Sequence, residues 1–495
     1  MGSQLLGIDI GTSACKVAVF DADGLVLAQS NQPYQVYYPQ SGWAEQDADE
    51  WWNAICQGIK DVLKKEGVNR DEICGIGVDG QSWSAIPVNR EGKALYRTPI
   101  WMDTRSREIC KQVKDKVGDN LIFDIAGNDF LPSYSTPKML WFKKERPEIF
   151  DETYKFLQSN SYIVMKLTGM MSQDYSQGYG IHFFNVNTLT YDTELAGKMG
   201  LSVDLVPDLF RSDEIVGTVS IKAAEETGLK VGTPVVAGGL DAACGTLGAG
   251  VYKAGQTQEQ GGQAGGMSIC TEKALSHKKL ILGPHVVPGL WLLQGGTVGG
   301  GGALKWFCQE LGNGASFDAL TEEAAKISPG SDGVIFLPYM AGERSPIWDP
   351  DAKGVFYGLS FEKTKGHMIR AILEGVAYSL EHNLCTAAET GIQIDTLNAM
   401  GGASNSHLWT QIKADVTGRR IQVPASDTAT TLGAAILAGI GCGVYKNYEE
   451  AVSRTISITR VHEPNMDNHR VYERKMELYL ELYEDLKETF ARYSG

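Results

Sequence analysis

The sequence predicts an α/β protein made of two similar halves. Apolar, β-branched runs alternate with segments of helical periodicity along a chain of 495 residues. That length is enough for two to four domains at about 100–200 residues each. Each half contains a pair of strands interrupted by a Gly-rich turn, at residues 5–20 and again at residues 257–275. This repetition favours a duplicated unit.

The first half opens with three predicted antiparallel strands, at residues 5–10, 15–20 and 25–30, separated by "GTSA" and "DADG". A helix is predicted from Asp47 to about Gly67, with Asp47 and Glu50 as a capping box and Gly67 as the stop signal. Its apolar face holds Trp51, Ile55, Ile59 and Val62. A buried strand at 73–80, strands at 84–89 and 99–103 and a helix at 104–116 are predicted next.

The second half begins with the strand pair at 257–275 and continues mainly with helices, predicted at 301–311, 318–327, 366–390 and 407–416. Helix 366–390 carries an apolar stripe of Ile369, Ile372, Val376 and Leu380. The tail at 467–492 has Val471, Lys475, Leu478, Leu482 and Leu486 at helical spacing. This spacing predicts a packed amphipathic helix, with a coiled-coil seam as the alternative.

The composition excludes several classes of partner. Hydrophobic residues make up 43% of the chain and charged residues 21%, which is typical of a globular protein. A formal net charge of −15 argues against binding nucleic acid or an anionic membrane, which need basic patches. The nine cysteines are widely spaced, no long apolar run predicts a membrane span, and the first residues lack the order of a signal peptide. We therefore expect a cytoplasmic protein with reduced thiols.

Two nucleotide motifs can be set aside from the sequence. "GIGVDG" at 75–80 fits the spacing of a dinucleotide fingerprint, but the residues that follow it are strand-like instead of opening a helix. No P-loop pattern occurs, and the eight histidines form no metal-binding motif.

The turn Gly11-Thr12-Ser13 between the first two strands is a candidate phosphate cradle. Such a turn exposes backbone N–H groups and two hydroxyls, and Asp9 at the strand end could hold Mg²⁺. The alternative is an ordinary hairpin turn. Lys16 lies either near the phosphates or at the surface.

Three further Gly-rich segments are candidates for chemistry. In "VVAGGLDAACGTLGAG" (235–250), Asp241 follows bare glycine backbone at a strand end, where it could accept a proton from a substrate hydroxyl. "GGTVGGGGALKWFCQELG" (295–312) runs into a helix whose N-terminus favours anions. In "LNAMGGASNSHLW" (397–409), two glycines would let adenine lie against the backbone. A cap or a tight turn is the alternative for each.

Residues 79–84 and 99–106 combine flat aromatic faces with charge. Trp83, Trp101, Asp103 and Arg105 are the mixture that carbohydrate sites use. A core tryptophan with a structural Asp–Arg pair is the alternative.

The chain carries in this order "DIGTSACK", "WMDTR", "AGGLDAA", "FLPYMAGERSPIWDPDAKGVFYGLS", "LEGVAYSL" and "MGGASNSHLWTQIKADVTGRRIQVP". Together these segments resemble the FGGY carbohydrate kinases of the actin/Hsp70/sugar-kinase superfamily, from about residue 5 to about residue 445. Within that family the chain looks most like the xylulokinase-type members. The resemblance implies two ribonuclease-H-like (actin-like ATPase) domains of duplicated βββαβα topology with a central cleft. Residues 1–245 would hold the sugar and the first phosphate loop, and residues 246–495 would bind ATP and end in the amphipathic helix.

The resemblance also implies roles for individual residues. Asp241 would be the general base on the sugar hydroxyl, and Asp9 and Asp241 would hold Mg²⁺, directly or through water. The implied sugar contacts are Ser82, Trp83, Trp101, Asp103 and Asp241. The implied ATP and phosphate contacts are Gly11, Thr12, Ser13, Gly265, Gly266, Gly301, Lys305, Gly401, Gly402 and Asn405.

The chain departs from the xylulokinase-type pattern at three places. It has Ser82-Trp83 in place of Met-His, and Asp241-Ala242 in place of Asp-Asn. Its second phosphate loop reads Gln263-Ala264-Gly265-Gly266 where Gly-Thr-Ser-Gly is common. The last change removes hydroxyls and keeps backbone amides, whereas the first two alter side chains that would touch the sugar.

The resemblance implies an ATP-dependent kinase of a small ketose, with D-xylulose as the first candidate. L-xylulose, ribulose, gluconate, glycerol and erythritol are the alternative acceptors. Two different classes are a non-catalytic sugar or nucleotide sensor and an Hsp70-like ATPase with a protein partner; Asp9, Asp241 and the Trp/Asp cluster argue against these. We expect ATP/ADP, Mg²⁺ and a sugar as ligands, no nucleic acid or membrane, and a homodimer as one assembly.

Overall fold

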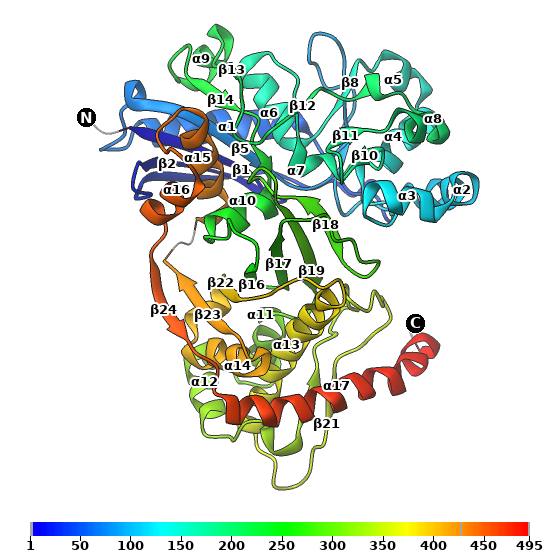
Figure 1. The fold of residues 1–495 in the computed structure, drawn as a ribbon, viewed down its shortest axis with the longest axis vertical. Helices are drawn as coiled ribbons and strands as arrows, with labels where there is room; N and C mark the ends of the chain where they lie inside the picture. Colours follow the sequence, from blue (N-terminus) through cyan, green and yellow to red (C-terminus); the bar gives the residue numbers. More distant parts are fainter. Residues whose placement is uncertain (1–2, 426–427, 494–495) are drawn as a thin grey trace.

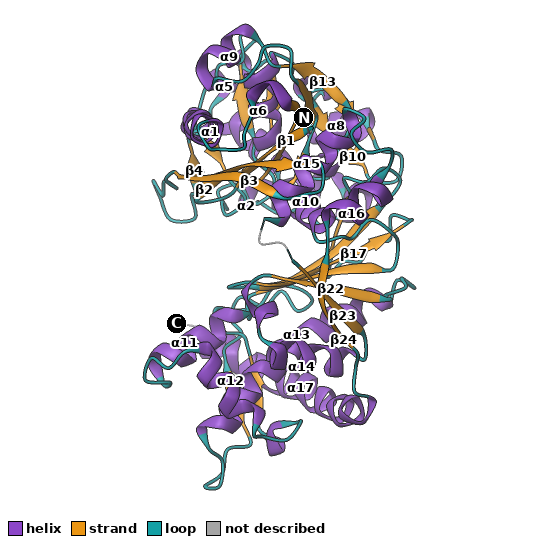
Figure 2. Cartoon of the chain, turned by 90° about the vertical axis from the view of Figure 1, so that its left-hand side faces the viewer, coloured by secondary structure: helices purple, strands orange, loops and turns teal. Residues whose placement is uncertain are grey.

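In the computed structural model, which describes residues 3–425 and 428–493, the chain forms two units, each built on a seven-stranded sheet (Figures 1 and 2). The outermost residues of the two predicted halves, 1–2 and 494–495, lie outside the described part. The first sheet contains β1 (Gln4–Ile10), β2 (Ala14–Asp21), β3 (Val26–Pro33), β5 (Ile73–Gly80), β13 (Ile215–Thr218), β14 (Pro234–Val236) and β15 (Gly239–Leu240). The second contains β16 (Gln256–Gly261), β17 (Gly265–Thr271), β18 (Ile281–Pro284), β19 (Trp291–Thr297), β22 (Thr396–Met400), β23 (Arg420–Pro424) and β24 (Ile458–His462).

The two sheets repeat one topology. The first has the order β13-β14-β5-β1-β2-β3, and the second has β24-β23-β22-β16-β17-β19 in the corresponding places, with β18 added at its edge. The sense of pairing also agrees: β1–β2 and β16–β17 are antiparallel, and β1–β5 and β16–β22 are parallel. The duplicated α/β unit predicted from the sequence is therefore confirmed.

Helices cover the sheets. In the first unit they are α1 (Ala48–Leu63), α2 (Arg107–Val117), α3 (Asp119–Ala126), α4 (Ser135–Glu145), α5 (Pro147–Glu152), α6 (Ser159–Thr168), α7 (Tyr175–Gly178), α8 (Thr193–Met199), α9 (Ile221–Thr227) and α10 (Asp241–Gly248). Later in the chain come α11 (Gly301–Glu310), α12 (Phe317–Ala325), α13 (Lys365–Ala388), α14 (His407–Thr417), α15 (Ala429–Gly441), α16 (Tyr448–Thr455) and α17 (Met466–Tyr493). The remaining strands pair in twos: β4 (Glu45–Gln46) with β7 (Thr98–Pro99), β6 (Ile86–Val88) with β8 (Lys155–Leu157), β9 (Gln173–Asp174) with β12 (Leu209–Phe210), β10 (Phe184–Asn185) with β11 (Thr190–Tyr191), and β20 (Ile335–Leu337) with β21 (Val355–Tyr357). Among the described helices, none combines the length and apolar character that a membrane span needs.

The predicted elements are found with two local corrections. Asp47 caps α1 by accepting from the Asp49 N–H, but the Glu50 carboxylate accepts from the Tyr37 hydroxyl at 2.6 Å, so the predicted capping box is wrong. A tertiary partner here replaces the local one. The strands predicted at 84–89 and 99–103 shrink to β6 and to β7, which ends at Pro99.

Helix α17 packs on its own chain and is buried mainly through tyrosines. Tyr472, Tyr479 and Tyr483 are buried in the core of the second unit with Leu482 and Phe490, and the Tyr479 and Tyr339 hydroxyls are 2.8 Å apart. The buried stripe is thus turned by one residue from the predicted Val471 and Leu478. The amphipathic helix is confirmed, with its hydrophobic face set by tyrosines that find hydroxyl partners.

Helices α15 and α16 return to the first unit, although they follow the strands of the second in sequence (Figure 1, orange). Helix α15 lies directly on β1 and β5, where a Cβ added to Gly7 or Gly77 would stand 2.1 or 1.9 Å from a carbonyl oxygen of α15. Gly433 of α15 faces α10 in the same way. Only glycine permits this approach of helix backbone to strand backbone. A single cut between residues 245 and 246 therefore does not describe the packing.

Candidate active site

Three carboxylates meet at one edge of the first sheet. Asp9 on β1 and Asp79 on β5 are directly paired on adjacent parallel strands, and Asp79 is paired with Gly239 on β15. Asp241 follows β15 and is the first residue of α10. The carboxyl ends of parallel strands share an edge, so the strand register itself brings these side chains together. The predicted Asp9 and Asp241 lie here, and Asp79 is a third member that the sequence analysis missed.

Burial and mutual repulsion hold protons on this cluster. Asp79 is fully buried, and its carboxyl group lies against that of Asp9. Burial, followed by the charges of Asp9 and Asp241, raises the pKa of Asp79 well above its ordinary value. Burial also raises the pKa of Asp9, against the opposing charge of Lys16 and a 3.0 Å hydrogen bond from Thr430 of α15.

Asp241 is the member of the cluster that is poised to exchange a proton near neutrality. Its side chain keeps some contact with solvent, and its Oδ1 accepts from the Ala242 N–H at 2.6 Å. Burial first, and the Asp9 charge second, raise the pKa of Asp241 to about 7. A carboxylate with a pKa near the working pH is suited to act as a general base.

The turn at residues 11–13 connects β1 and β2, and its carbonyl oxygens accept hydrogen bonds from neighbouring side chains. The Gly11 carbonyl accepts from the Tyr34 hydroxyl at 2.5 Å, and the Thr12 carbonyl accepts from Gln46 Nε2 at 2.7 Å. No hydrogen bond among the described residues uses the N–H of Thr12 or Ser13. The turn is thus a hairpin whose amides remain available to an anion.

Lys16 joins this edge only loosely. Its Nζ lies 3.9 Å from Asp9 Oδ2, while 57% of its side chain is exposed. The lysine is therefore at the surface, next to the carboxylate cluster, and its place near the phosphates stays a prediction.

The predicted sugar contacts separate into two groups. Ser82 and Trp83 lie in the loop after β5, close to the carboxylates, and the Trp101 indole, 36% exposed, donates to Thr12 Oγ1 at 3.0 Å. Asp103 behaves differently, because it is fully buried and both of its oxygens accept hydrogen bonds, from Arg105 and from the Ala44 N–H. Both oxygens of Asp103 thus have protein partners in this arrangement, which agrees with the structural Asp–Arg pair, and its role as a sugar contact stays a prediction.

An aromatic cluster beside Asp241 was not found from the sequence. The Trp83 ring stacks on Tyr134, with ring centres 4.1 Å apart and planes 19° from parallel, and meets Tyr179 edge-on at 5.8 Å. Burial, followed by the Asp241 charge, raises the pKa of Tyr179. The three rings come from three separate segments, so no periodicity in the sequence signals them.

Four of the predicted nucleotide contacts line one cavity of the second unit. Gly301, Lys305, Gly402 and Asn405 border a space of about 680 Å³ that Phe317 and Trp409 also line. Gly401 has a φ of +85°, and a Cβ there would stand 2.8 Å from the Gly261 carbonyl oxygen. Segments around residues 262, 301 and 402 therefore converge on a site large enough for a nucleotide.

The first amides of α11 are not free. The N–H groups of Gly301 and Gly302 donate to the carbonyl oxygens of Gly262 and Gln263 at 2.8 and 2.9 Å. The predicted anion site at this helix start is therefore wrong for these two amides. They anchor the 262–264 loop, and Gly301 serves as cavity wall.

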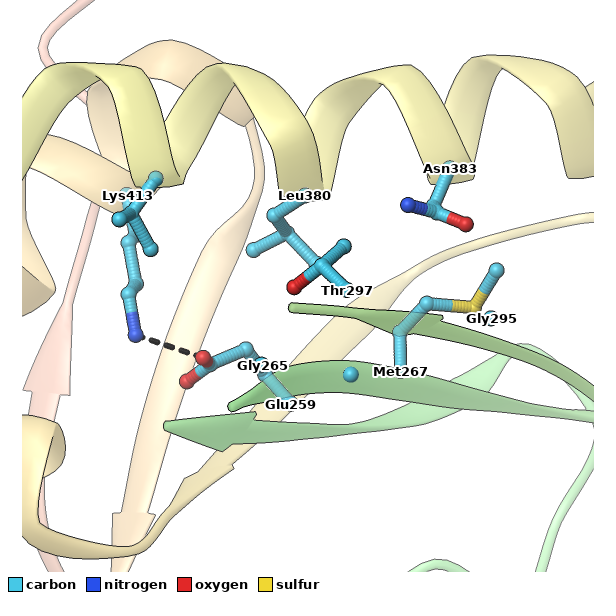
Figure 3. Close-up of a pocket in the computed structure, with 10 residues that line it drawn as sticks. Glu259, Gly265, Met267, Gly295, Thr297, Leu380, Asn383 and Lys413 are labelled. Atoms are coloured by element: carbon cyan, nitrogen blue, oxygen red, sulfur yellow. Dashed lines mark hydrogen bonds and ion pairs between the residues drawn. The ribbon is translucent and has the colours of Figure 1, made fainter. Parts of the chain in front are cut away.

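Gly265 and Gly266 begin β17, directly after the turn at 262–264, which corresponds in the second sheet to the turn at 11–13 in the first. They lie beside a buried ion pair in which Lys413 Nζ is 2.6 Å from Glu259 Oε1, below Leu380 and Asn383 of α13 (Figure 3). The predicted second phosphate loop thus lies next to a buried ion pair.

The donor set fits Mg²⁺. The carboxyl groups of Asp9, Asp79 and Asp241 offer hard oxygen ligands at the same edge of the first sheet. No cage of three or more His, Cys, Asp or Glu ligands forms within residues 3–425 and 428–493. Mg²⁺ does not require one, because it keeps several waters and binds through one or two carboxylates together with substrate phosphates.

Known proteins match the whole chain. The model of the N-terminal domain of the FGGY family of carbohydrate kinases matches residues 4–248, and that of the C-terminal domain matches residues 266–442. The chain is 32% identical to a xylulose kinase of Staphylococcus epidermidis, with 98% of both chains covered. It is 29% identical to a gluconokinase of Bacillus licheniformis, over 100% of this chain and 98% of that one. The crystal structure of xylulose kinase from Rhodospirillum rubrum superposes with a TM-score of 0.91 at 28% identity, covering 99% of this chain and 100% of that one.

Proposed function

Since the chain belongs to the FGGY family of carbohydrate kinases, we propose that it transfers the γ-phosphate of ATP to a hydroxyl of D-xylulose or a closely related ketose. The observation that carries this proposal is Asp241, a carboxylate with a pKa of about 7 beside Asp9 at the edge of the first sheet. The similarity to xylulose kinase over 98% of the chain supports the choice of acceptor.

In the proposed reaction Asp241 removes the proton from the acceptor hydroxyl as its oxygen attacks the γ-phosphorus. The new O–P bond forms while the bond from phosphorus to the leaving oxygen of ADP breaks, and the proton remains on an Asp241 carboxyl oxygen. The open amides of Thr12 and Ser13 would bind phosphoryl oxygens. Mg²⁺ held by Asp9, and by Asp241 directly or through water, would neutralise charge on the phosphates.

The pH dependence follows from the pKa of Asp241. The base must be deprotonated, so kcat/KM for the acceptor is expected to rise with pH through about 7 and to level above it. Glu343→Gln is the control, because Glu343 is another buried carboxyl group with a pKa of about 7 and lies outside this cluster. It should leave the midpoint of the pH profile unchanged. A profile that is flat from pH 5.5 to 8.5, or that falls across it, would contradict the assignment of Asp241.

Lys305 is expected to act on nucleotide binding alone. It is exposed on α11 and lines the cavity of the second unit, so Lys305→Met should raise the KM for ATP by about fivefold to tenfold and leave the acceptor KM unchanged. Lys326→Met, at an exposed lysine outside that cavity, is the control and should change neither value. An equal rise in both KM values would place Lys305 elsewhere in the mechanism.

The acceptor is tested by measuring ADP release with D-xylulose, L-xylulose, D- and L-ribulose, gluconate, glycerol and erythritol. We expect the highest kcat/KM with D-xylulose. Gluconate is the second candidate, because the chain is 29% identical to a gluconokinase and because Ser82-Trp83 replaces the Met-His pair of xylulokinase-type members. Activity on no ketopentose would overturn the choice of D-xylulose, and sugar binding without ADP release would favour a sensor.

We further propose that the protein acts in the cytoplasm. Its donor ATP is available there, and all nine cysteines are unpaired thiols, as a reducing compartment favours.

A further inference from the structure

Lys138 is a buried lysine bonded only to backbone carbonyls. It lies on α4, its side chain is fully buried, and its Nζ donates to the carbonyl oxygens of Trp83 at 2.8 Å and of Ser133 at 2.5 Å. In the described part of the chain it has no ion-pair partner. Burying an ammonium group is costly, and burial lowers the pKa of Lys138 to about 7 although the charge of the Asp103 carboxylate opposes this shift.

The two carbonyl acceptors belong to the two segments that carry the stacked rings. One is that of Trp83 itself, and the other is that of Ser133, the residue before Tyr134. A single amine therefore joins the loop after β5 to the segment that leads into α4. The ring stack, with planes 19° from parallel, depends on the relative position of these two backbones.

Trp83 is held in a conformation that tryptophan rarely adopts. Its φ is +59°, in the left-handed region, where a bulky residue costs of order 1–3 kcal/mol and persists only if its surroundings hold it. The Lys138 bond to the Trp83 carbonyl is thus a direct restraint on a strained residue.

The restrained rings border the carboxylate edge. Trp83 lies four positions after Asp79. Tyr179 contacts the rings of both Trp83 and Tyr134 edge-on, and the charge of Asp241 contributes to the raised pKa of Tyr179. Trp83 occupies one of the two positions where this chain departs from the xylulokinase-type pattern on the sugar side.

We propose that Lys138 is a positioning residue for acceptor specificity: by joining the backbones of Trp83 and Ser133 it fixes Trp83, which is 9% exposed and stacks on the buried Tyr134, beside the sugar site. This inference rests on the proposed function, because it requires that a sugar binds next to the Trp83–Tyr134 stack. Lys138 does not touch the acceptor and acts through Trp83.

The test is Lys138→Met, which keeps an unbranched apolar stem and removes the donors. Its KM for D-xylulose, or for the best acceptor of the panel, is expected to rise by at least about tenfold, with the KM for ATP unchanged. The matched control is Lys155→Met, since Lys155 Nζ also donates to two carbonyl oxygens, of Asp204 and Val206, in a part of the same unit without the ring stack. The control should leave both KM values unchanged.

A double-mutant cycle separates positioning from general loss of structure. Trp83→Gly relieves the strained φ and removes the ring, so adding Lys138→Met to it should raise the acceptor KM no further. If Lys138→Met does not fold, Lys138→Leu, which also removes the donors, is measured by the same criteria.

Three results would overturn the inference: an unchanged acceptor KM in a folded Lys138 variant, an equal rise in the KM values for acceptor and ATP, or additive effects in the cycle. A wild-type protein that phosphorylates no acceptor would instead overturn the proposed function, and this role of Lys138 with it.

Discussion

Replacing Asp241 with alanine is expected to lower kcat for acceptor phosphorylation by about 10²–10⁴-fold. The carboxylate is the group at the carboxyl edge of the first sheet whose pKa, about 7, matches a general base. Nucleotide binding should persist, because the cavity lined by Gly301, Lys305, Gly402 and Asn405 belongs to the second unit. ADP release measured with the preferred acceptor, together with calorimetric titration of ADP, checks both halves of this expectation.

The control for Asp241→Ala is a substitution that removes a carboxylate charge elsewhere without loss of helix capping. Asp192 caps α8 by accepting from the Leu195 N–H at 2.8 Å, and asparagine caps helices equally well. Asp192→Asn should therefore retain wild-type kcat. Turnover near the wild-type rate in Asp241→Ala would show that another group takes the proton.

Of the substitutions proposed here, Gly77→Ala is expected to lower the free energy of unfolding the most. Its Cβ would stand 1.9 Å from the Ala434 carbonyl oxygen, so β5 and α15 must separate. Overpacking of this kind costs about 1–3 kcal/mol or more in the free energy of unfolding. Activity should fall as well, because β5 carries Asp79 and α15 carries Thr430, which bonds Asp9. Urea unfolding followed by tryptophan fluorescence measures the change.

Gly197 provides the matched control for Gly77. It lies in α8 with a helical backbone, and an added Cβ would meet nothing within 4 Å. Gly197→Ala should stabilise the protein by roughly 0.5–1 kcal/mol through helix propensity. If both substitutions had similar effects, close backbone packing would not be the reason for glycine at position 77.

Much of the fold was predictable because local residue patterns determine many of its helices, strands and turns. The hairpin turn at residues 11–13, the strand at 73–80 and the helix at 366–390 were predicted from alternation, periodicity and stop signals. The structure has the turn and the strand at these positions and the helix at Lys365–Ala388. Predictions failed where a distant partner competed with a near one. Glu50 binds Tyr37 instead of the start of its own helix, and tyrosines turn the buried face of α17.

The candidate site divides along the same line. Asp9 and Asp241 were found because each is an acidic residue at a strand end beside glycine, and the nucleotide glycines because they cluster. Asp79 also ends a strand, in "GIGVDG", and could have been found by aligning the parallel strands. Lys138 and Tyr179 carry no such signal, and the local Asp–Arg pattern does not indicate that the Ala44 N–H also binds Asp103.

The sequence by itself determined the class of the protein, the duplicated unit and the acidic and Gly-rich residues of the candidate site. Those properties depend on side-chain period and turn chemistry over a few residues. Only the tertiary structure decided that α15 returns to the first sheet, that Asp79 is buried between two other carboxylates, and that one lysine restrains Trp83 and the segment before Tyr134. Each of these rests on close contact between segments far apart in the chain. Such contacts arise from packing and desolvation, which no local pattern of residues records.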